Sequence, residues 1–255
     1  MTSEEKFQSF YSEVLLPKIQ LLKQTPWLED YSTRFKKEII GSIVKYHQPA
    51  LQYDPEDGIM LNAVEISKIF GDSLLEFSSC NLVKGKIGNT RVTFSNVVLT
   101  HEVYGMKPSF SGNFLIAEFN KKFSGEYYVI STGQKAKKIL QQVNRIRPSL
   151  IHVDNPEFEL EFAVFGSDTV EALYILTPAL MKRMLDFKKK IQADVHFSFN
   201  RSRLFAAIES TNKPLSVIPG EDFDKGTLLD WNQNLTFAVD LVEDLNLNTH
   251  LWSKP

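Results

Sequence analysis

The sequence predicts an α+β fold in which helices at both ends of the chain pack on a largely antiparallel sheet. Three observations support this prediction. Apolar residues recur at helical spacing through residues 1–72 and again after residue 226. Between these regions, several runs alternate apolar and polar residues, as half-buried strands do. Hydrophobic residues make up 43% of the 255 residues, which is enough for a substantial core.

The N-terminal region is expected to be helical. Thr2 and Glu5 have the spacing of a capping box, and apolar residues follow at helical intervals. Pro17 should kink or split this first helix, because proline lacks a backbone donor and crowds the preceding turn. A second helix is expected over residues 26–46.

A third, shorter helix is expected over residues 60–70, with Gly71 as its C-cap. Residues 1–72 are therefore predicted to be an N-terminal helical region. Residues 73–255 are predicted to be an α+β domain, and the two regions should pack as one compact unit.

The first strands are predicted where the period changes to two. Residues 82–104 should form two strands joined at Gly88 and Asn89, which tolerate positive φ. The runs "NFLIAEF" and "EYYVIS" should form the next pair, with "NKKFSG" as a hairpin turn between them. On this interpretation Asn120 and Gly125 serve the turn backbone, and Lys121 and Lys122 are solvated charges.

The second half of the chain is predicted to mix helices and strands. A helix is expected over 134–145, then a strand at "SLIHV", while "PEFELEFAVFG" is compatible with either structure. Thr177 and Pro178 should cap and begin another helix. A hairpin turning at Asn200 and a long helix over residues 227–244 should follow.

Charge and cysteine content exclude several classes of protein. A net charge of −2 argues against a dedicated nucleic-acid binder, and "GKIG" lies between predicted strands rather than helices. The single Cys80 cannot close an intramolecular disulfide, which is typical of a reducing compartment. There is no signal-peptide pattern and no uncharged apolar run approaching about 18 residues. We therefore expect a cytoplasmic protein.

The sequence contains no recognisable catalytic or metal-binding motif. The five histidines lack the spacing of a zinc motif, and one cysteine excludes thiolate clusters. Phosphate-loop, dinucleotide and nucleophile-elbow motifs are missing from the sequence. The run "GEDFDKG" lacks the glycine and glutamate that a calcium loop requires. The sequence thus predicts no metal and no cofactor.

Charge is distributed unevenly along the chain. Residues 134–203 carry 12 basic and 8 acidic groups, whereas residues 204–255 carry 3 and 8. The two regions are expected to attract each other within the fold. The carboxylates of Asp240, Glu243 and Asp244 lie at the C-terminal end of the last predicted helix, where the helix dipole disfavours negative charge. Basic helices at 134–147 and 181–190 are expected to compensate them. The segment after them should fold back so that Leu247, Leu251 and Trp252 pack on the core.

Several long segments of the chain carry one resemblance. They are "LVKGKIGNTRVTFSNV", "FSGNFLIAEFNKKFSG", "VEALYILTPALMKRMLDFKKK", "HFSFNRSRLFAAI" and "LVEDLNLNTHLW", together with "YDPEDGI". On these segments the sequence resembles one bacterial family, the domain of unknown function 3137. The resemblance implies no established reaction. Many members look membrane-associated through apolar N-terminal spans, a pattern from which this chain departs. It also has His250 where related proteins usually carry arginine.

The sequence favours a non-enzymatic binding or scaffold module with a protein partner or a second copy of itself. One alternative is an enzyme with a carboxylate and histidine site. The other is weak contact with an anionic membrane through the two basic helices. The candidate binding residues are Glu118, Asn120, Lys121, Glu171 and His196.

Overall fold

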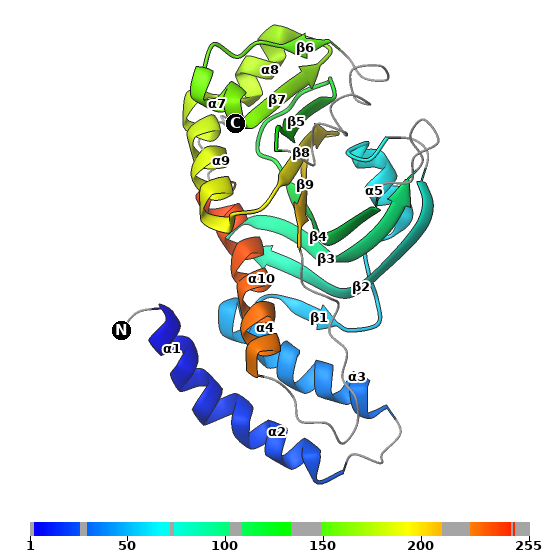
Figure 1. Cartoon of the computed structure of the whole chain (residues 1–255), viewed down its shortest axis with the longest axis vertical. Coiled ribbons are helices and arrows are strands. Elements are labelled where there is room, and N and C mark those ends of the chain that lie inside the picture. The colour runs from blue at the N-terminus through cyan, green and yellow to red at the C-terminus, as the bar shows by residue number, and fades with distance from the viewer. Residues whose placement is uncertain are drawn as a thin grey trace.

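The computed structural model describes residues 3–25, 30–71, 74–101, 109–133, 149–210, 225–245 and 247. In these residues nine strands form one sheet in the order β1-β2-β3-β4-β9-β8-β5-β7-β6, and the neighbouring strands run antiparallel. Helices precede and follow the sheet in the chain (Figure 1). The predicted α+β fold with terminal helices on an antiparallel sheet is confirmed.

The strands are β1 (Gln52–Asp54), β2 (Leu74–Ile87), β3 (Thr90–His101), β4 (Ser109–Glu118), β5 (Tyr127–Ser131), β6 (Leu150–Ile151), β7 (Phe162–Gly166), β8 (Val195–Asn200) and β9 (Arg203–Glu209). The α-helices are α1 (Ser3–Phe10), α2 (Leu16–Lys23), α3 (Tyr31–Phe35), α4 (Gly41–His47), α5 (Leu61–Ser67), α7 (Pro156–Glu161), α8 (Thr169–Ile175), α9 (Pro178–Ile191) and α10 (Lys225–Asp244). Two π-helical turns are η1 (Tyr11–Leu15) and η2 (Lys36–Ile40).

The first helix continues through Pro17. The π-helical turn η1 ends two residues before this proline, and the N–H of Leu16 bonds to the carbonyl of Tyr11. A π turn is wider than an α turn, so it gives the proline ring room and displaces the carbonyls that would lose a donor. Pro17 therefore interrupts the regular α-helix as expected, but by a π turn instead of a break.

The other N-terminal helices lie close to their predicted positions. The second is described from Tyr31 to His47, and residues 26–29 of the predicted range lie outside the described residues. The third, α5, is shorter than predicted, because Lys68 adopts a left-handed conformation with φ of 52° and caps it. Gly71, the predicted cap, follows with φ of 79°.

The connection between β4 and β5 corrects the sequence prediction. These strands do not pair with each other, because β9 and β8 lie between them in the sheet. "NKKFSG" is therefore no hairpin turn. It belongs to a segment that passes over the tip of the β8–β9 hairpin, whose turn residues Arg201 and Ser202 have φ of 51° and 56°. We call residues 119–126 the crossing segment.

Most other elements of the second half agree with the sequence. The ambiguous run "PEFELEFAVFG" contains both structures, helix α7 and then strand β7. Thr177 caps α9 by accepting a hydrogen bond from the N–H of Leu180 at 3.3 Å. The long closing helix is α10. The predicted helix over 134–145 lies outside the described residues.

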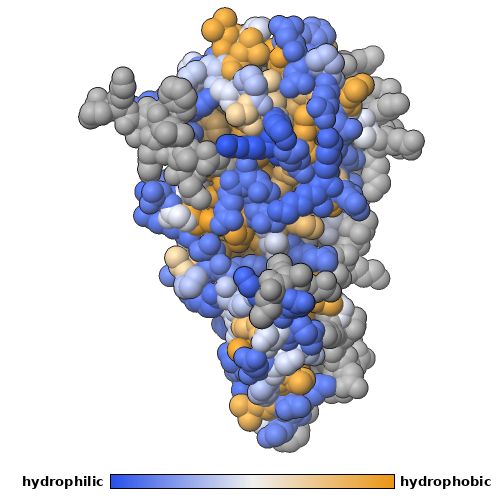
Figure 2. All heavy atoms as spheres, turned by 90° about the vertical axis from the view of Figure 1, so that its left-hand side faces the viewer, coloured by the Kyte–Doolittle hydropathy of each residue, from blue (hydrophilic) through white to orange (hydrophobic). Residues whose placement is uncertain are grey.

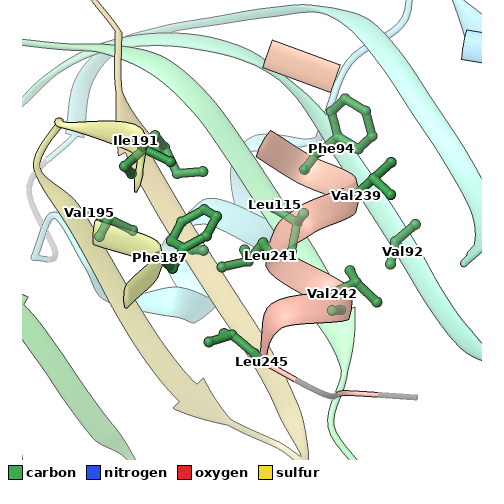
Figure 3. Close-up of a cluster of buried hydrophobic side chains, with 14 of the residues drawn as sticks. Val92, Phe94, Leu115, Phe187, Ile191, Val195, Val239, Leu241, Val242 and Leu245 are labelled. Atoms are coloured by element: carbon green, nitrogen blue, oxygen red, sulfur yellow. The ribbon is translucent and has the colours of Figure 1, made fainter. Parts of the chain in front are cut away.

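Hydrophobic cores lie on both faces of the sheet. Helices α9 and α10 cover one face, where Phe187 and Leu241 meet Leu115 of β4 and Phe94 of β3 (Figure 3). The same core cluster includes buried residues of the N-terminal helices, such as Phe35. We call this the helical face. Helix α5 packs on the opposite face over β2, β3, β4 and β9 through a separate cluster.

Two of the three carboxylates at the acidic end of α10, Asp240 and Asp244, pair with a basic helix, as predicted. The ammonium of Lys190 in α9 lies 2.7 Å from a carboxylate oxygen of Asp240 and 3.2 Å from one of Asp244. Leu247 is buried at 3% exposure in the main core. The other residues of the expected fold-back, Leu251 and Trp252, lie outside the described residues, as does the basic segment 134–147.

The length and polarity of a helix decide whether it could span a membrane. Among the residues that the structure describes, no helix is both long and apolar enough to span a bilayer.

Candidate functional site

The crossing segment joins two strands separated by two others. Three strand spacings of about 4.8 Å amount to roughly 14 Å, which eight residues can easily bridge. The segment is held to the hairpin beneath it by its own residues. The N–H of Phe119 donates to the carbonyl of Ser202 at 3.1 Å. The rings of Phe119 and Phe123 lie 5.1 and 6.5 Å from the ring of Phe199, measured between centroids.

Lys121 lies buried within this segment, contrary to the sequence prediction of a solvated charge. Its side chain is 8% exposed, and its ammonium donates to the carbonyls of Tyr174 and Ile175 at the end of α8. The ammonium also lies 4.7 Å from the centroid of the Tyr174 ring. A cation at a helix C-terminus satisfies the last carbonyls and interacts favourably with the helix dipole. Its neighbour Lys122 is exposed, as predicted.

Burial lowers the pKa of Lys121, because the charged form loses solvation. The carbonyl partners and the Tyr174 ring supply the compensation for that lost solvation. The ammonium is thus occupied as a structural cap on α8.

Glu171, near the start of α8, holds the other side of the crossing segment. Its carboxylate accepts hydrogen bonds from the N–H groups of Ser124 and Gly125, both at 2.8 Å, and from the hydroxyl of Tyr127 at 2.7 Å. These donors lower the pKa of Glu171, the Tyr127 hydroxyl contributing most. Conversely, burial and then Glu171 raise the pKa of Tyr127 to about 12.

Gly125 has a different role from the one predicted. Its φ lies outside the left-handed region, so no turn requires glycine here. A Cβ atom at this position would instead lie 2.6 Å from the Tyr127 hydroxyl and 2.7 Å from the Ser167 hydroxyl. Glycine is therefore needed because Tyr127 and Ser167 pack against its backbone.

Two further candidates lie near or beyond the ends of the crossing segment. Asn120 is part of it and is half-buried. Glu118 ends β4 with its side chain 52% exposed, and its carboxylate lies 3.1 Å from the guanidinium of Arg91 on β3. Glu118 thus pairs with β3, away from α8.

His196 lies on the other face of the sheet. Its neighbours in β8, Val195 and Phe197, belong to the core of the helical face, so alternation places His196 opposite to them. The ring is buried at 4% exposure, and its Nδ1 accepts a hydrogen bond from the N–H of Ser131 at 3.3 Å. Tyr127, the partner of Glu171, belongs to the helical face. The structure therefore separates Glu171 from His196 by the thickness of the sheet.

The structure thus brings together Lys121 and Glu171 out of the five predicted residues. Both hold α8 against the crossing segment through hydrogen bonds that occupy their charged groups. In the described ranges, no three His, Cys, Asp or Glu side chains are arranged to hold a metal ion. Physically, the hydrogen bonds of Lys121 and Glu171 fix the position of helix α8 on the crossing segment.

Helix α8 presents an apolar face that sequence reasoning missed. Val170, Leu173 and Tyr174 occupy positions i, i+3 and i+4 and are 78%, 39% and 47% exposed. We call these three residues the α8 face. The missed signal was Asp168: its carboxylate caps α8 by accepting from the N–H of Glu171 at 2.7 Å. This capping-box spacing predicts a helix start, and hence which residues share a face.

More exposed apolar side chains lie at the same end of the molecule. Leu160 of α7 is 77% exposed and Leu150 of β6 is 52% exposed. Helices α7 and α8 and strand β6 lie together at the top of Figure 1. Figure 2 shows hydrophobic surface at this end of the molecule.

Comparisons with known proteins identify a family for this sequence. The model of the family described as "Protein of unknown function (DUF3137)" matches residues 108–247. No curated protein matches the sequence. Among solved structures, the crystal structure of the mycobacterial trehalose monomycolate transport factor A, TtfA, is 14% identical with a TM-score of 0.38. The match covers 80% of this chain and 93% of that one.

Proposed function

The chain belongs to the DUF3137 family of unknown function, and we propose that it is a non-enzymatic binding module that recognises a protein partner through the α8 face. The observation that carries this proposal is the exposure of Val170, Leu173 and Tyr174 on one side of a helix fixed at both ends. A rigid apolar face buries its area on binding with a smaller ordering penalty than a flexible segment. Single exposed apolar residues need no explanation, whereas contiguous exposed apolar patches mark interaction sites.

The positions of the charged candidates support binding over catalysis. An enzyme with a carboxylate and histidine site would need Glu171 and His196 within reach of one substrate. The sheet lies between them, and the carboxylate of Glu171 already accepts three hydrogen bonds at 2.8 Å or less. The enzyme alternative therefore has no geometric support among these residues.

Ion pairing weakens the membrane alternative. Four lysines of α9 each have a carboxylate partner: Lys182 with Asp186, Lys188 with Glu161, Lys189 with Glu157, and Lys190 with Asp240 and Asp244. Such pairing reduces the positive charge that α9 offers to anionic lipid. We retain a cytoplasmic location in the proposal, because the single Cys80 cannot close an intramolecular disulfide, which is typical of a reducing compartment.

Site-specific photo-crosslinking in intact bacterial cells tests the proposal. A benzophenone amino acid at position 173 should give a discrete adduct with another protein, identified by mass spectrometry. Val170→Asp should remove this adduct, because a carboxylate on the face opposes burial. A crosslinker at Met60, which is 73% exposed on another part of the surface, is the matched control.

The outcomes separate the possibilities. An adduct of twice the chain mass would indicate self-association in place of a partner. Equal adducts at positions 173 and 60, or no adduct at position 173, would contradict a binding role for the α8 face.

A further inference from the structure

Strand β2 lies near the end of the sheet that is formed by β1, far from β6 and β7 in the strand order. β2 has β3 on one side, but β1 pairs only with Leu82, Val83 and Lys84 on the other. Next to that stretch, residues 55–59 cover the strand. The N–H groups of Asn81 and Leu82 donate to Pro55 and Asp57 at 3.2 and 3.0 Å.

Beyond this cover, the outer side of residues 75–78 of β2 has no backbone partner among the residues that the structure describes. Leu75 is 46% exposed, and Glu76 and Ser78 are also exposed. We call residues 75–78 the open edge. In Figure 1, β2 extends well past β1.

The open edge carries only some of the features that usually prevent strand addition. Proteins block such edges with charged residues (lysine above all), proline, β-bulges, very short strands or a covering element. Here a bulge at Leu75 begins the open edge, and Glu76 is its one charged residue. The sequence here is "LEFS", without lysine or proline, in a strand of 14 residues. Beyond the bulge at Leu75, the register is regular from Glu76 to Cys80, paired with Thr100 to Asn96, so the evenly placed backbone groups of the open edge begin at Glu76.

We propose that the open edge binds an extended segment of another protein, which adds a strand to the sheet beside β2. Unpaired backbone N–H and C=O groups in a strand are satisfied by an extended backbone, which fixes the conformation of the occupant. The proposal is independent of the α8 face.

The charge of the edge specifies the chemistry of this segment. Glu76 is exposed within the open edge, and Glu56 and Asp57 are exposed where residues 55–59 cover the strand. The lysines of β2, Lys84 and Lys86, lie farther along, in or past the stretch paired with β1. An opposite charge across from Glu76 is stabilising. The segment therefore carries a basic residue opposite Glu76 and an apolar residue beside Leu75.

The same charge argues against a second copy of the chain as the occupant. Antiparallel pairing of two open edges about their centre would place the two Glu76 carboxylates opposite or diagonal to each other. Like charges at such positions destabilise a strand pair.

A random heptapeptide library displayed on phage, selected on the immobilised full chain, is the direct test. Enriched peptides should alternate apolar and polar residues and contain lysine or arginine. On binding a selected peptide, the amides of residues 75–78 should become protected from hydrogen exchange. N-methylation of alternate peptide amides should abolish binding, while methylation of the intervening ones should not.

Variants of the chain sharpen the test. Glu76→Lys should weaken binding of a selected peptide about fivefold or more, as expected for reversing one cross-strand charge pair. Leu75→Lys should weaken it as well, whereas Leu21→Lys should not, because Leu21 is 64% exposed on α2. Circular dichroism confirms that each variant is folded.

Three results would overturn the proposal. They are a selection that enriches no peptide, peptides that bind all variants equally, and protection outside the open edge. Concentration-dependent dimerisation that protects residues 75–78 would likewise overturn it, because the occupant would then be a second copy.

Discussion

The crossing segment buries a charged side chain, whereas the open edge of β2 exposes an apolar one. The crossing segment contains two consecutive lysines, yet Lys121 is buried and its ammonium is held by α8. The open edge begins with leucine, yet Leu75 is 46% exposed. In the first case two intervening strands and a helix surround the chain; in the second, β1 is too short to cover its neighbour. Local polarity therefore does not locate the surface of this molecule.

The largest expected effect concerns the ring beneath the crossing segment. Phe199→Ala should lower the free energy of unfolding by roughly 3–5 kcal/mol, because a fully buried ring is replaced by a cavity. Phe77→Ala at the open edge should lower it by less, since that ring is only half-buried. Urea unfolding of both variants measures the contrast. Equal losses would show that the two regions are equally well packed.

The two adjacent lysines provide the next comparison. Lys121→Met removes the donor to the carbonyls of Tyr174 and Ile175 but keeps the packing of the stem. It should lower the free energy of unfolding by roughly 1–2 kcal/mol. Lys122→Met should change it by less than about 0.5 kcal/mol, as at most exposed sites. If thermal and urea unfolding of the two variants coincide, the ammonium of Lys121 does not stabilise α8.

The carboxylate of Glu171 should make part of the stability depend on pH. Its pKa is lower in the folded chain than its ordinary value of 4.5. The stabilisation is therefore complete above pH 4.5 and is lost as the pH falls through the folded pKa. Glu171→Gln should cost roughly 1 kcal/mol at pH 7, after allowance for solvent screening, and the cost should shrink as the pH falls further below 4.5. Urea unfolding of both proteins across this range measures the difference, and a constant difference would contradict the ionic role.

The smallest expected effect is at the open edge itself. Leu75→Lys should change the free energy of unfolding by less than about 0.5 kcal/mol, because nearly half of the side chain is exposed and no described element covers it. A loss of 2 kcal/mol or more in urea unfolding would show that Leu75 packs within the fold, and the edge would then not be open.

Elements with strong local signals were predictable from the sequence. Gly88 and Asn89 join β2 and β3 as expected, and Gly88 has φ of 57°. Thr177 and Pro178 begin α9 because a hydroxyl cap and a fixed proline φ act within one turn. The pairing of Lys190 with the acidic end of α10 also followed from the distribution of charge. The division into a helical region and an α+β domain stays a prediction.

The candidate site was only partly predictable. Lys121 and Glu171 were identified as candidate residues, but their roles were not. Lys121 of the crossing segment binds α8, and Glu171 of α8 binds the crossing segment, about fifty residues away in the sequence. The α8 face was overlooked although the spacing of Asp168 and Glu171 indicated a helix. His196 could not be assigned to a face relative to Glu171 without knowing which strands are neighbours.

The sequence by itself determined most of the periodic elements, their order, the turn at Gly88 and Asn89, and the family of this protein. These properties depend on interactions within a few residues, or on segments recognisable one at a time. Only the tertiary structure decided that β8 and β9 lie between β4 and β5, and that β1 pairs with only three residues of β2. Strand order depends on pairings between distant segments, for which alternating apolar residues are equally suitable in many combinations. Burial of Lys121 and exposure of Leu75 follow from that order, so neither could be read from the residues around them.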